Sequence, residues 1–417
     1  MDSVQDMQNV PKASVKDVNF ADPAFLVEPW PELVRLQKEA PVYWSEDRQG
    51  WLLTRHADVK AAYADKRFSA ARMDQFFRGL SPEVVDDLQA IKKYYAINVS
   101  RMDGADHMRI RTLMLKAFNK GSIRKIEGFI AELIQQILDR CEAEREFEFT
   151  ELVSSKLPTM VIQHLLGLPD DSQGELFKLA STVTAAVAAA TPTDQLMLDM
   201  EYSIRRLNDV FNELIALREK EPGDDLISTL VHARDGLHRL NHDELLACFH
   251  AIIVAGTETT ANTLGVGLHK IASDPRLVQR LRDDPDCAYA LASDLLRYPG
   301  TVKCRTRIAA EDFELHGQSI RKGDLIWIMN AAANVDESVF ENPFEINPDR
   351  DTRESMAFSP GLHFCIGYHL ATLELSEFFK KAFSRFDITI VQDKIEMIPS
   401  YVFYGYQSLR VRFEPRK

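Results

Sequence analysis

Apolar residues recur at three- and four-residue spacing along most of the chain, which is the pattern of amphipathic helices. The pattern is sustained over Glu127–Glu144, Asp199–Lys220, Asp243–Ala272 and Tyr368–Phe386. Strand patterns are fewer and shorter. The sequence therefore predicts a mostly α fold with minor β, in which small sheets lie at the edges and late in the chain.

Three pairs of short apolar runs bounded by turn residues predict strands. The first pair reads as a hairpin. The second is joined through turns at His316-Gly317 and Lys322-Gly323, and the third lies near the C-terminus. In chain order the pairs are Val42–Trp44 with Trp51–Thr54, Phe313–Leu315 with Leu325–Ile328, and Phe386–Val391 with Leu409–Phe413.

The helix predicted over Asp243–Ala272 is the longest and is apolar on nearly every face. Asn241 is a suitable N-cap, with Glu244 placed to complete a capping box. A helix of this length spans roughly 45 Å, so we expect it to cross the interior. Its middle, Ala255–Thr260, nevertheless contains a glycine, an acid and three hydroxyl side chains. Buried polar groups of this kind need partners or water, so the stretch predicts either a tolerated kink or a functional site.

The chain has 417 residues without an internal repeat or a Gly/Ser linker, which predicts a single domain over 1–417. Residues from about 1–20 are polar, and we expect a flexible N-terminus. A net charge of -13 disfavours nucleic-acid binding. The sequence contains neither a signal-peptide pattern nor an apolar run long enough to span a membrane, so we expect a cytoplasmic protein.

The five cysteines are odd in number and widely spaced, as in proteins of reducing compartments. A lone cysteine is ordinarily a small apolar core residue. Cys365, however, lies in a loop just before a predicted helix, and a helix N-terminus lowers the pKa of a thiol. Gly361 and Gly367 flank it and permit close backbone approach. The five are Cys141, Cys248, Cys287, Cys304 and Cys365.

The segment from Phe358 to Ala371 reads F-S-P-G-L-H-F-C-I-G-Y-H-L-A. It resembles the haem-binding loop of the cytochrome P-450 superfamily, and the likeness to soluble bacterial members extends over about residues 20 to 413. The resemblance implies that Cys365 is the thiolate ligand of the iron of haem b and that His363 holds a propionate, with Gly367 in the same cofactor loop. Ser359 stands where bacterial members often have glycine.

Ala255–Thr260 is similar to the family's A-G-x-[DE]-T-T segment, which makes Glu258 and Thr259 the expected acid–alcohol pair. Reduction of molecular oxygen, the implied co-substrate, consumes protons. A carboxylate that relays them and a hydroxyl that holds water meet this need. We expect Gly256 to make room for the oxygen.

His107 and Arg111 match the family's H-x-x-x-R and lie four residues apart, hence on one helix face. The resemblance implies that they bind a haem propionate and that Arg307 binds the other. Without the cysteine loop elsewhere in the chain, His107 and Arg111 would be interpreted as ordinary charged residues on the surface of a helix.

Asp294-Leu295-Leu296-Arg297 stands where the family has E-x-x-R, with an acid one methylene shorter. The position usually held by a later base is Glu345. We expect either that Arg297 lies between two carboxylates or that Arg350 substitutes as the second base. The change predicts weakened haem retention or stability rather than lost chemistry.

We expect the substrate pocket to combine the stretch Arg72–Ser100 with the central helix and two late segments. Lys303 and Arg305 are unusual there. They predict either a cationic anchor for a carboxylate-bearing substrate, or a propionate contact for Arg305 with Lys303 facing water. Weak similarity over Arg297–Asp351 favours polyketide or macrolide substrates. The expected lining residues are Met73, Phe76, Phe77, Ala251, Ala255, Val302, Lys303, Arg305, Val402 and Phe403.

The resemblance implies a monooxygenase that hydroxylates or epoxidises a small organic molecule with electrons from a ferredoxin or flavodoxin. A basic run after His107 is either a docking face for that acidic partner or an ordinary solvated face. Two other functions stay open: a peroxide-driven peroxygenase, against which Glu258-Thr259 argues, and a non-catalytic haem protein. The basic run consists of Arg109, Lys116, Lys120, Arg124 and Lys125.

Overall fold

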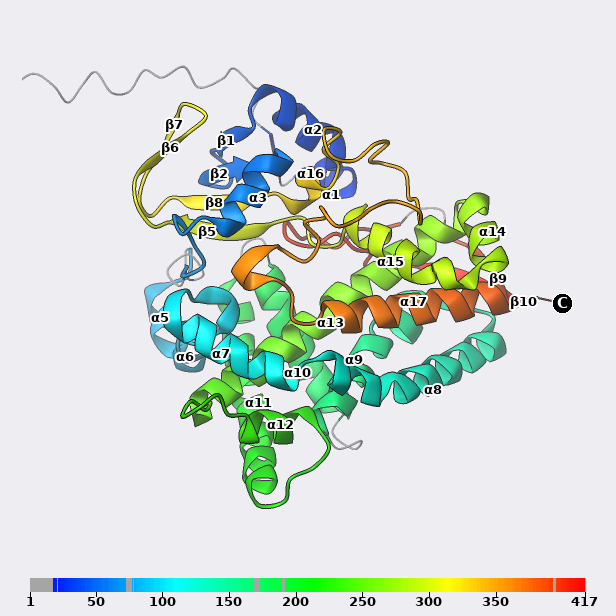
Figure 1. Ribbon diagram of the computed structural model, residues 1–417, viewed down its shortest axis with the longest axis horizontal. Coiled ribbons are helices and arrows are strands. Elements are labelled where there is room, and N and C mark those ends of the chain that lie inside the picture. Colours follow the sequence, from blue (N-terminus) through cyan, green and yellow to red (C-terminus); the bar gives the residue numbers. More distant parts are fainter. Residues whose placement is uncertain are drawn as a thin grey trace, which may run out of the picture.

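The structure is a computed structural model in which helices surround one long central helix, and the strands lie in small sheets toward the edges, one group at the upper left of the view and another at the right (Figure 1). The predicted fold class, mostly α with minor β, is confirmed. The residues that the structure describes are 18–20, 22–72, 77, 79–168, 173–189, 192–392 and 395–416.

All four of the long helices predicted from periodicity are present, and three begin earlier than the pattern indicated, one of them by a single residue. The helices are α1 (Pro23–Val27), α2 (Trp30–Glu39), α3 (His56–Ala64), α5 (Pro82–Asp87), α6 (Gln89–Ala96), η1 (Val99–Arg101), α7 (Gly104–Ala117), α8 (Lys120–Glu144), η2 (Thr150–Ser154), α9 (Lys156–Leu166), α10 (Gln173–Ala188), α11 (Asp194–Lys220), α12 (Leu226–His232), α13 (His242–Ala272), α14 (Pro275–Asp283), η4 (Pro285–Cys287), α15 (Ala288–Arg297), α16 (Asn330–Ala333), η5 (Gly361–His363) and α17 (Tyr368–Arg385).

The central helix α13 is continuous and begins where the sequence placed its cap. The Asn241 side chain accepts a hydrogen bond from the Glu244 backbone N–H, and the Glu244 side chain accepts one from the Asn241 backbone N–H. This reciprocal pair satisfies two of the free donors at the helix start. The helix then runs without a break in its helical assignment through Gly256.

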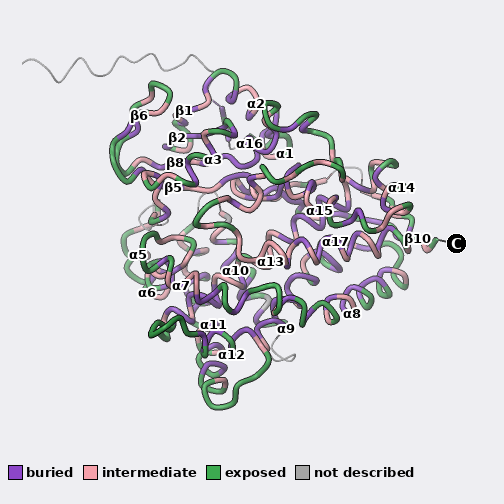
Figure 2. Tube along the Cα trace, viewed as in Figure 1, coloured by how far each residue is buried: buried purple, intermediate pink, exposed green. Residues whose placement is uncertain are grey.

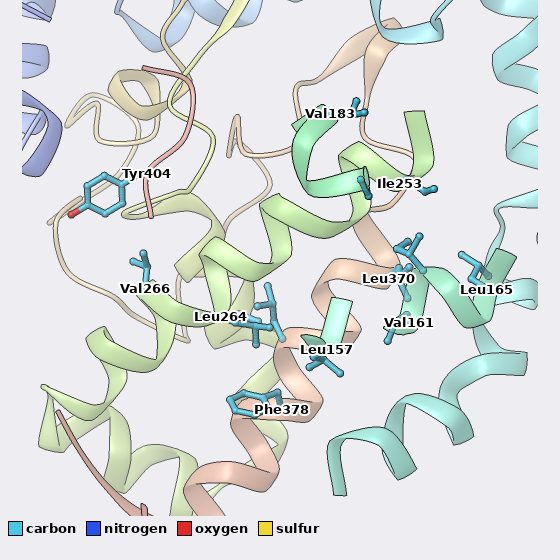
Figure 3. Packing of buried hydrophobic residues seen from close by; sticks show 14 of the residues in the cluster. Leu157, Val161, Leu165, Val183, Ile253, Leu264, Val266, Leu370, Phe378 and Tyr404 are labelled. Carbon is cyan, nitrogen blue, oxygen red and sulfur yellow. The ribbon is translucent and has the colours of Figure 1, made fainter. Parts of the chain in front are cut away.

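Apolar side chains from three helices pack against α13 along much of its length. Figure 3 shows Leu157 of α9 beside Leu264 of α13 and Phe378 of α17. All three side chains are fully excluded from solvent. The burial map in Figure 2 likewise shows the most buried segments around α13 and α17. The core therefore fixes α13 against α17, the helix that follows Cys365.

The hairpin predicted near the N-terminus is confirmed as β1 (Val42–Ser45) paired antiparallel with β2 (Gly50–Leu53). The two late strands predicted from the sequence are confirmed as β9 (Phe386–Ile390) and β10 (Arg410–Pro415). They pair with each other, and β4 (Glu146–Glu148) joins the other edge of β10.

The second predicted pair is wrong, because β6 (Phe313–Leu315) pairs with β7 (Gln318–Ile320). His316 and Gly317 both have positive φ, so they close a two-residue hairpin that reverses the chain at once. The strand β8 (Leu325–Ile328) instead lies between β2 and β5 (Arg305–Ala309), parallel to β2. Within the described residues the sheet order is β1-β2-β8-β5-β3, with β3 at Phe68–Ser69.

Of the segment predicted to be a flexible N-terminus, the structure describes residues 18–20. Val18 and Phe20 are buried, and the Phe20 ring packs edge-on against Phe25 at 4.9 Å. The rest of that segment, residues 1–17, lies outside the described residues. Among the helices that the structure describes, none combines the length and the hydropathy needed to cross a bilayer.

Candidate functional site

Cys365 lies in the turn between η5 and the first residue of α17. Its backbone N–H donates to the Phe358 carbonyl at 3.0 Å. Burial raises the pKa of the Cys365 thiol, although the Gly367 N–H and the charges of Arg305 and Arg111 oppose the shift. The sequence predicted a lowered thiol pKa from the helix N-terminus, and this prediction is wrong for the protein without a bound metal. The effect of desolvation on the thiol pKa is larger than the opposing effect of the helix N-terminus. A metal ion would deprotonate such a thiol directly.

The loop before Cys365 is held by contacts to α3. A side chain at Gly361, where φ is 87°, would meet the Tyr63 carbonyl oxygen at 2.9 Å. Ser359 also has positive φ, 54°, which explains why glycine suits this position. The Ser359 hydroxyl offsets part of that strain by bonding the Tyr63 hydroxyl at 3.1 Å, and the Tyr63 hydroxyl donates to Asn330 at 2.6 Å. Sequence reasoning missed Tyr63, because nothing near it in the chain marks it.

Basic side chains gather beside this loop, as the sequence predicted. The rings of His107 and His363 lie 4.2 Å apart, and Arg111 on α7 donates to the Phe364 carbonyl at 2.5 Å. Arg307 on β5 is buried and donates only to the backbone of its neighbour Thr306. Among the described residues, neither Arg111 nor Arg307 forms an ion pair. The four predicted propionate ligands are thus brought to one site.

His107 supports the assignment of an anionic ligand to this site. Its Nε2 is buried and has no hydrogen-bond partner among the residues that the structure describes, a costly state for a polar atom. Burial, reinforced by the charges of His363 and Arg111, lowers the pKa of His107 to about 4, so the ring is neutral near pH 7. A neutral imidazole N–H can donate to a carboxylate. The orphaned nitrogen, the unpaired arginines and the nearby thiol fit a haem with two propionates.

Asp103 is a further residue of this cluster that sequence reasoning did not identify. Its carboxylate lies 3.6 Å from Nε2 of His363 and accepts hydrogen bonds from Ser69 and from the Ala70 backbone. These hydrogen bonds, together with the His363 contact, hold the pKa of Asp103 well below its usual range. Asp103 therefore orients His363. Its position four residues before His107 was the available signal.

Glu258 and Thr259 lie at the middle of α13, on adjacent faces. Asn262 donates to the Glu258 carboxylate at 3.1 Å, and burial raises the pKa of Glu258. The Thr259 hydroxyl donates to the Ala255 carbonyl at 2.9 Å. Ala255 is exposed although it lies in the centre of the fold. Because Thr259 lies one helical turn after Ala255 on α13, the open space beside Ala255 also faces Thr259. A carboxyl group ready to hold a proton thus lies beside a hydroxyl at an internal space.

Gly256 lies at a close contact between α13 and α9. A Cβ at this position would lie 2.5 Å from Cδ1 of Ile162 on α9. Glycine therefore suits the close packing of α9 on α13. The expectation that the weak helix at Gly256 makes room for oxygen stays a prediction.

The predicted substrate-pocket residues are only partly testable, because Met73 and Phe76 lie outside the described residues. Val302 and Phe403 form a β-bridge, and the Lys303 N–H donates to the Val402 carbonyl at 2.8 Å. The two late segments therefore meet, as expected. Ala251 is half-buried on the α13 face that also carries Ala255.

Lys303 is 2% exposed, so the alternative in which it faces water is wrong. Its ammonium donates to the Ser400 carbonyl at 2.7 Å. Burial lowers the pKa of Lys303 to about 8. One hydrogen bond leaves two of its three N–H donors without an acceptor among the described residues. Arg305, two residues on, is half-buried.

Of the two arrangements expected around Asp294, the structure has the one in which Arg350 is the second base. Arg350 substitutes as the second base, with Nε 3.2 Å from Oδ1 of Asp294. Glu345 contributes its backbone carbonyl to Arg297, at 3.0 Å, rather than its carboxylate. Asp294 also accepts from the Asn347 N–H at 2.7 Å. The shorter acid therefore has partners on both of its oxygens, and the expectation of weakened haem retention or stability stays a prediction.

The predicted basic run is largely neutralised by local acids. Arg109 pairs with Glu244, Lys116 with Asp235 and Lys125 with Asp224, at 2.5 to 2.7 Å. Within the described part of the chain, only Lys120 and Arg124 of this run are exposed without an ion pair. The run is a weaker positive patch than the sequence indicated.

The sequence of this chain matches a protein-family model and is similar to proteins of known family. The family model described as Cytochrome P450 matches residues 51–292 and 290–405. The polyketide biosynthesis cytochrome P450 PksS of Bacillus subtilis is 30% identical over 397 residues, covering 92% of this chain and 95% of that protein. The 6-deoxyerythronolide B hydroxylase of Saccharopolyspora erythraea is 28% identical, with coverage of 94% and 97%.

Solved structures with a similar fold lead to the same family. The crystal structure of CalO2 superimposes with a TM-score of 0.88 at 25% identity, covering 96% of this chain and all of that one. The PksS structure from Bacillus subtilis gives a TM-score of 0.86 at 29% identity, with coverage of 95% and 100%. Family model, relatives and fold lead to one conclusion: the chain belongs to the cytochrome P450 family.

Proposed function

We propose that this cytochrome P450 monooxygenase uses Cys365 to ligate the iron of haem b and His107, Arg111, Arg307 and His363 to hold the two propionates. The observation that carries the assignment is the orphaned Nε2 of His107 among unpaired arginines, beside the Cys365 loop. The backbone N–H of Gly367 lies close to the sulfur, where it stabilises negative charge.

Bound haem would supply the redox-active iron at which molecular oxygen is reduced. The overall reaction inserts one oxygen atom into the substrate and reduces the other to water, consuming two electrons and two protons. Glu258, whose pKa is raised by burial, holds a proton on its carboxyl group and gives it up toward Thr259. The Thr259 hydroxyl donates to or accepts from water on the open side of α13 and so directs the proton.

We infer that the substrate is a small organic molecule of the polyketide type that carries an acidic group. Two relatives bear names that place them in polyketide chemistry, and an epothilone C/D epoxidase of Sorangium cellulosum is 26% identical over 407 residues. The buried ammonium of Lys303 supports the acidic group, because its free donors favour a carboxylate. Hydroxylation and epoxidation are both compatible with this site.

For electron supply we propose a small acidic ferredoxin or flavodoxin in the cytoplasm. Lys120 and Arg124 are the exposed cations of the α7–α8 region that remain available to an acidic partner. Because the neighbouring cations already pair with acids of this chain, the contribution of charge to docking is modest.

Turnover in ¹⁸O₂ with a surrogate ferredoxin, its reductase and NADPH tests this function. We expect a product that carries one labelled oxygen atom, and a much slower reaction with hydrogen peroxide alone. Faster turnover with peroxide would favour the peroxygenase. Absence of product from a broad substrate panel, despite a normal thiolate spectrum, would favour a non-catalytic haem protein.

A further inference from the structure

The backbone carbonyl of Thr259, at the middle of α13, is held by a pair of buried hydroxyl groups. The Thr263 hydroxyl donates to this carbonyl at 2.8 Å, and the Thr301 hydroxyl lies within donating distance of it at 3.3 Å. The two hydroxyl oxygens lie 2.9 Å apart. Thr263 is 2% exposed and Thr301 is 4% exposed, so solvent does not compete for these hydrogen bonds. Three threonines therefore share one hydrogen-bonded triangle.

Both hydroxyl groups are needed to complete the triangle. The Thr259 carbonyl has two lone pairs, and in a regular helix the backbone N–H of Thr263 uses one of them. The other lone pair accepts one hydroxyl hydrogen, so the second hydroxyl donates to the first. The shorter contacts favour a chain in which Thr301 donates to Thr263 and Thr263 donates to Thr259. Each donor in such a chain polarises the next, so Thr301 strengthens the bond to the Thr259 carbonyl.

Thr301 belongs to a different part of the chain, the segment between α15 and β5. Its own carbonyl accepts a hydrogen bond from the Tyr404 backbone N–H at 2.8 Å, and the next residue, Val302, forms a β-bridge with Phe403. Val302 and Phe403 are two of the residues that we expect to line the substrate pocket. The side chain of Thr301 thus holds α13, whereas its backbone continues into the expected pocket wall.

The turn before Thr301 sets the direction of its side chain. Gly300 has a φ of 61°, and a Cβ at this position would lie 2.7 Å from the carbonyl oxygen of Arg297. Only glycine lets the chain turn this closely over the end of α15. Arg297 is itself fully buried and paired with Asp294, so the turn begins at a fixed point.

We propose that Thr301 is a positioning residue for Thr259 and that it links the wall of the substrate pocket to this turn of α13. A substrate in contact with Val302 displaces the backbone of Thr301, and the hydroxyl pair passes the displacement to the Thr259 carbonyl. The Thr259 hydroxyl is bonded within the same helix, to Ala255, so it moves with the turn. The inference rests on the role proposed for Thr259 and adds the contact that aligns it.

The test observes the Thr259 carbonyl directly by NMR. Thr259-Thr260 is the only pair of consecutive threonines in the sequence, so threonine labelled with ¹³C at the carbonyl and ¹⁵N at the amide gives a single carbonyl–amide correlation. The sample is the haem-loaded full-length protein, reduced and with carbon monoxide bound, because that form is diamagnetic.

Two substitutions at one position separate the hydroxyl from the shape of the side chain. Thr301→Val removes the hydroxyl and keeps the shape, whereas Thr301→Ser keeps the hydroxyl. Thr301→Ala replaces the first variant if that variant fails to fold. Thr159→Val is the control, because it removes a buried hydroxyl of α9 that donates to the Ser155 carbonyl, outside the triangle.

We expect the Thr259 carbonyl signal to move upfield in Thr301→Val, because hydrogen bonding to the carbonyl weakens, and to keep its parent position in Thr301→Ser and in Thr159→Val. Val302→Ala should move the signal in the parent but not in the Thr301→Val background, since the link is then broken. An unmoved signal in a folded Thr301→Val variant would overturn the inference, as would an equal effect of Val302→Ala in both backgrounds.

Turnover in ¹⁸O₂ gives the second readout. Labelled product per NADPH consumed should fall roughly two- to tenfold in Thr301→Val, the size expected for one neutral hydrogen bond, and should recover in Thr301→Ser. An unchanged ratio in Thr301→Val would overturn the positioning role. A parent that forms no labelled product would refute the proposed function instead, and the carbonyl signal would still decide whether Thr301 holds Thr259.

Discussion

Arg297 and Asp294 form an ion pair from which water is wholly excluded: Nε of Arg297 lies 2.6 Å from Oδ1 of Asp294, and both side chains are 0% exposed. Arg297 also donates to the carbonyls of Asn334 and Pro343. One side chain thus ties α15 to the long loop that leads to the cysteine.

Because both Asp294 oxygens are bonded, we predict that Asp294→Ala lowers the free energy of unfolding by about 3–5 kcal/mol, since it leaves Arg297 charged and buried. Asp294→Glu restores the family's usual acid, yet should still cost about 1–3 kcal/mol, because the extra methylene has no room. Urea unfolding measures both. A more stable Asp294→Glu variant would mean that the network is incomplete.

His107→Ala should retain the fold and lose haem more readily. The substitution removes a buried donor whose acceptor we infer to be a propionate, a loss of about 1.5–3 kcal/mol, which corresponds to roughly ten- to a hundredfold faster release. Transfer of haem to excess apomyoglobin measures the release rate. Asp106→Ala, an exposed change one residue away, is the control, and equal rates for the two variants would contradict the assignment of His107.

Gly256→Ala should destabilise the protein by about 1–3 kcal/mol, because its methyl group would overlap Ile162. Ile162→Val removes the overlapping Cδ1, so the double variant should recover part of that loss. Thermal unfolding of the two single variants and the double variant gives the coupling energy. Additive effects would show that Gly256 is not needed for the contact with α9.

The features that the sequence predicted correctly are local ones. The cap at Asn241 and Glu244, the periodicity of α13 and the cysteine loop each lie within a short segment, so one segment contains the whole signal. The pairing of β8 with β2 was missed because the two strands are far apart in the chain. The tight turn at His316-Gly317 brings β7 next to β6, so β6 pairs with β7.

Functional details that were missed depend on partners from elsewhere in the fold. The burial of Lys303 depends on Ser400, nearly one hundred residues away. The purpose of Gly256 depends on Ile162, and the raised thiol pKa of Cys365 depends on burial that a motif does not encode. The family resemblance named the candidate residues, whereas only the structure placed their neighbours.

Lys303→Met should weaken binding of a carboxylate-bearing substrate by roughly ten- to a hundredfold, since a charged hydrogen bond contributes about 1.5–3 kcal/mol. The methyl ester of the same compound is the matched ligand and should bind both proteins alike. Titration of the haem spin-state change measures each affinity. Equal loss for acid and ester would contradict the anchor.

The lowered pKa of Lys303 predicts that both the free energy of unfolding and the binding of an acidic substrate depend on pH. Its pKa falls from the usual 10.5 to about 8 on folding, so the unfolded chain binds the proton more tightly. The unfolding free energy of the parent should therefore rise with pH across this window, and that of Lys303→Met should lack this rise. In the parent, acid binding should weaken as pH passes 8, because the ammonium loses its charge.

The most direct test of the central claim is the absorption spectrum of the reduced protein with carbon monoxide bound. If the Cys365 thiolate ligates iron, the purified protein contains haem and its adduct has the red-shifted Soret band of a thiolate ligand, which Cys365→His abolishes. A protein purified without haem after expression with haem precursor, or an adduct with an imidazole-type band, would contradict the assignment.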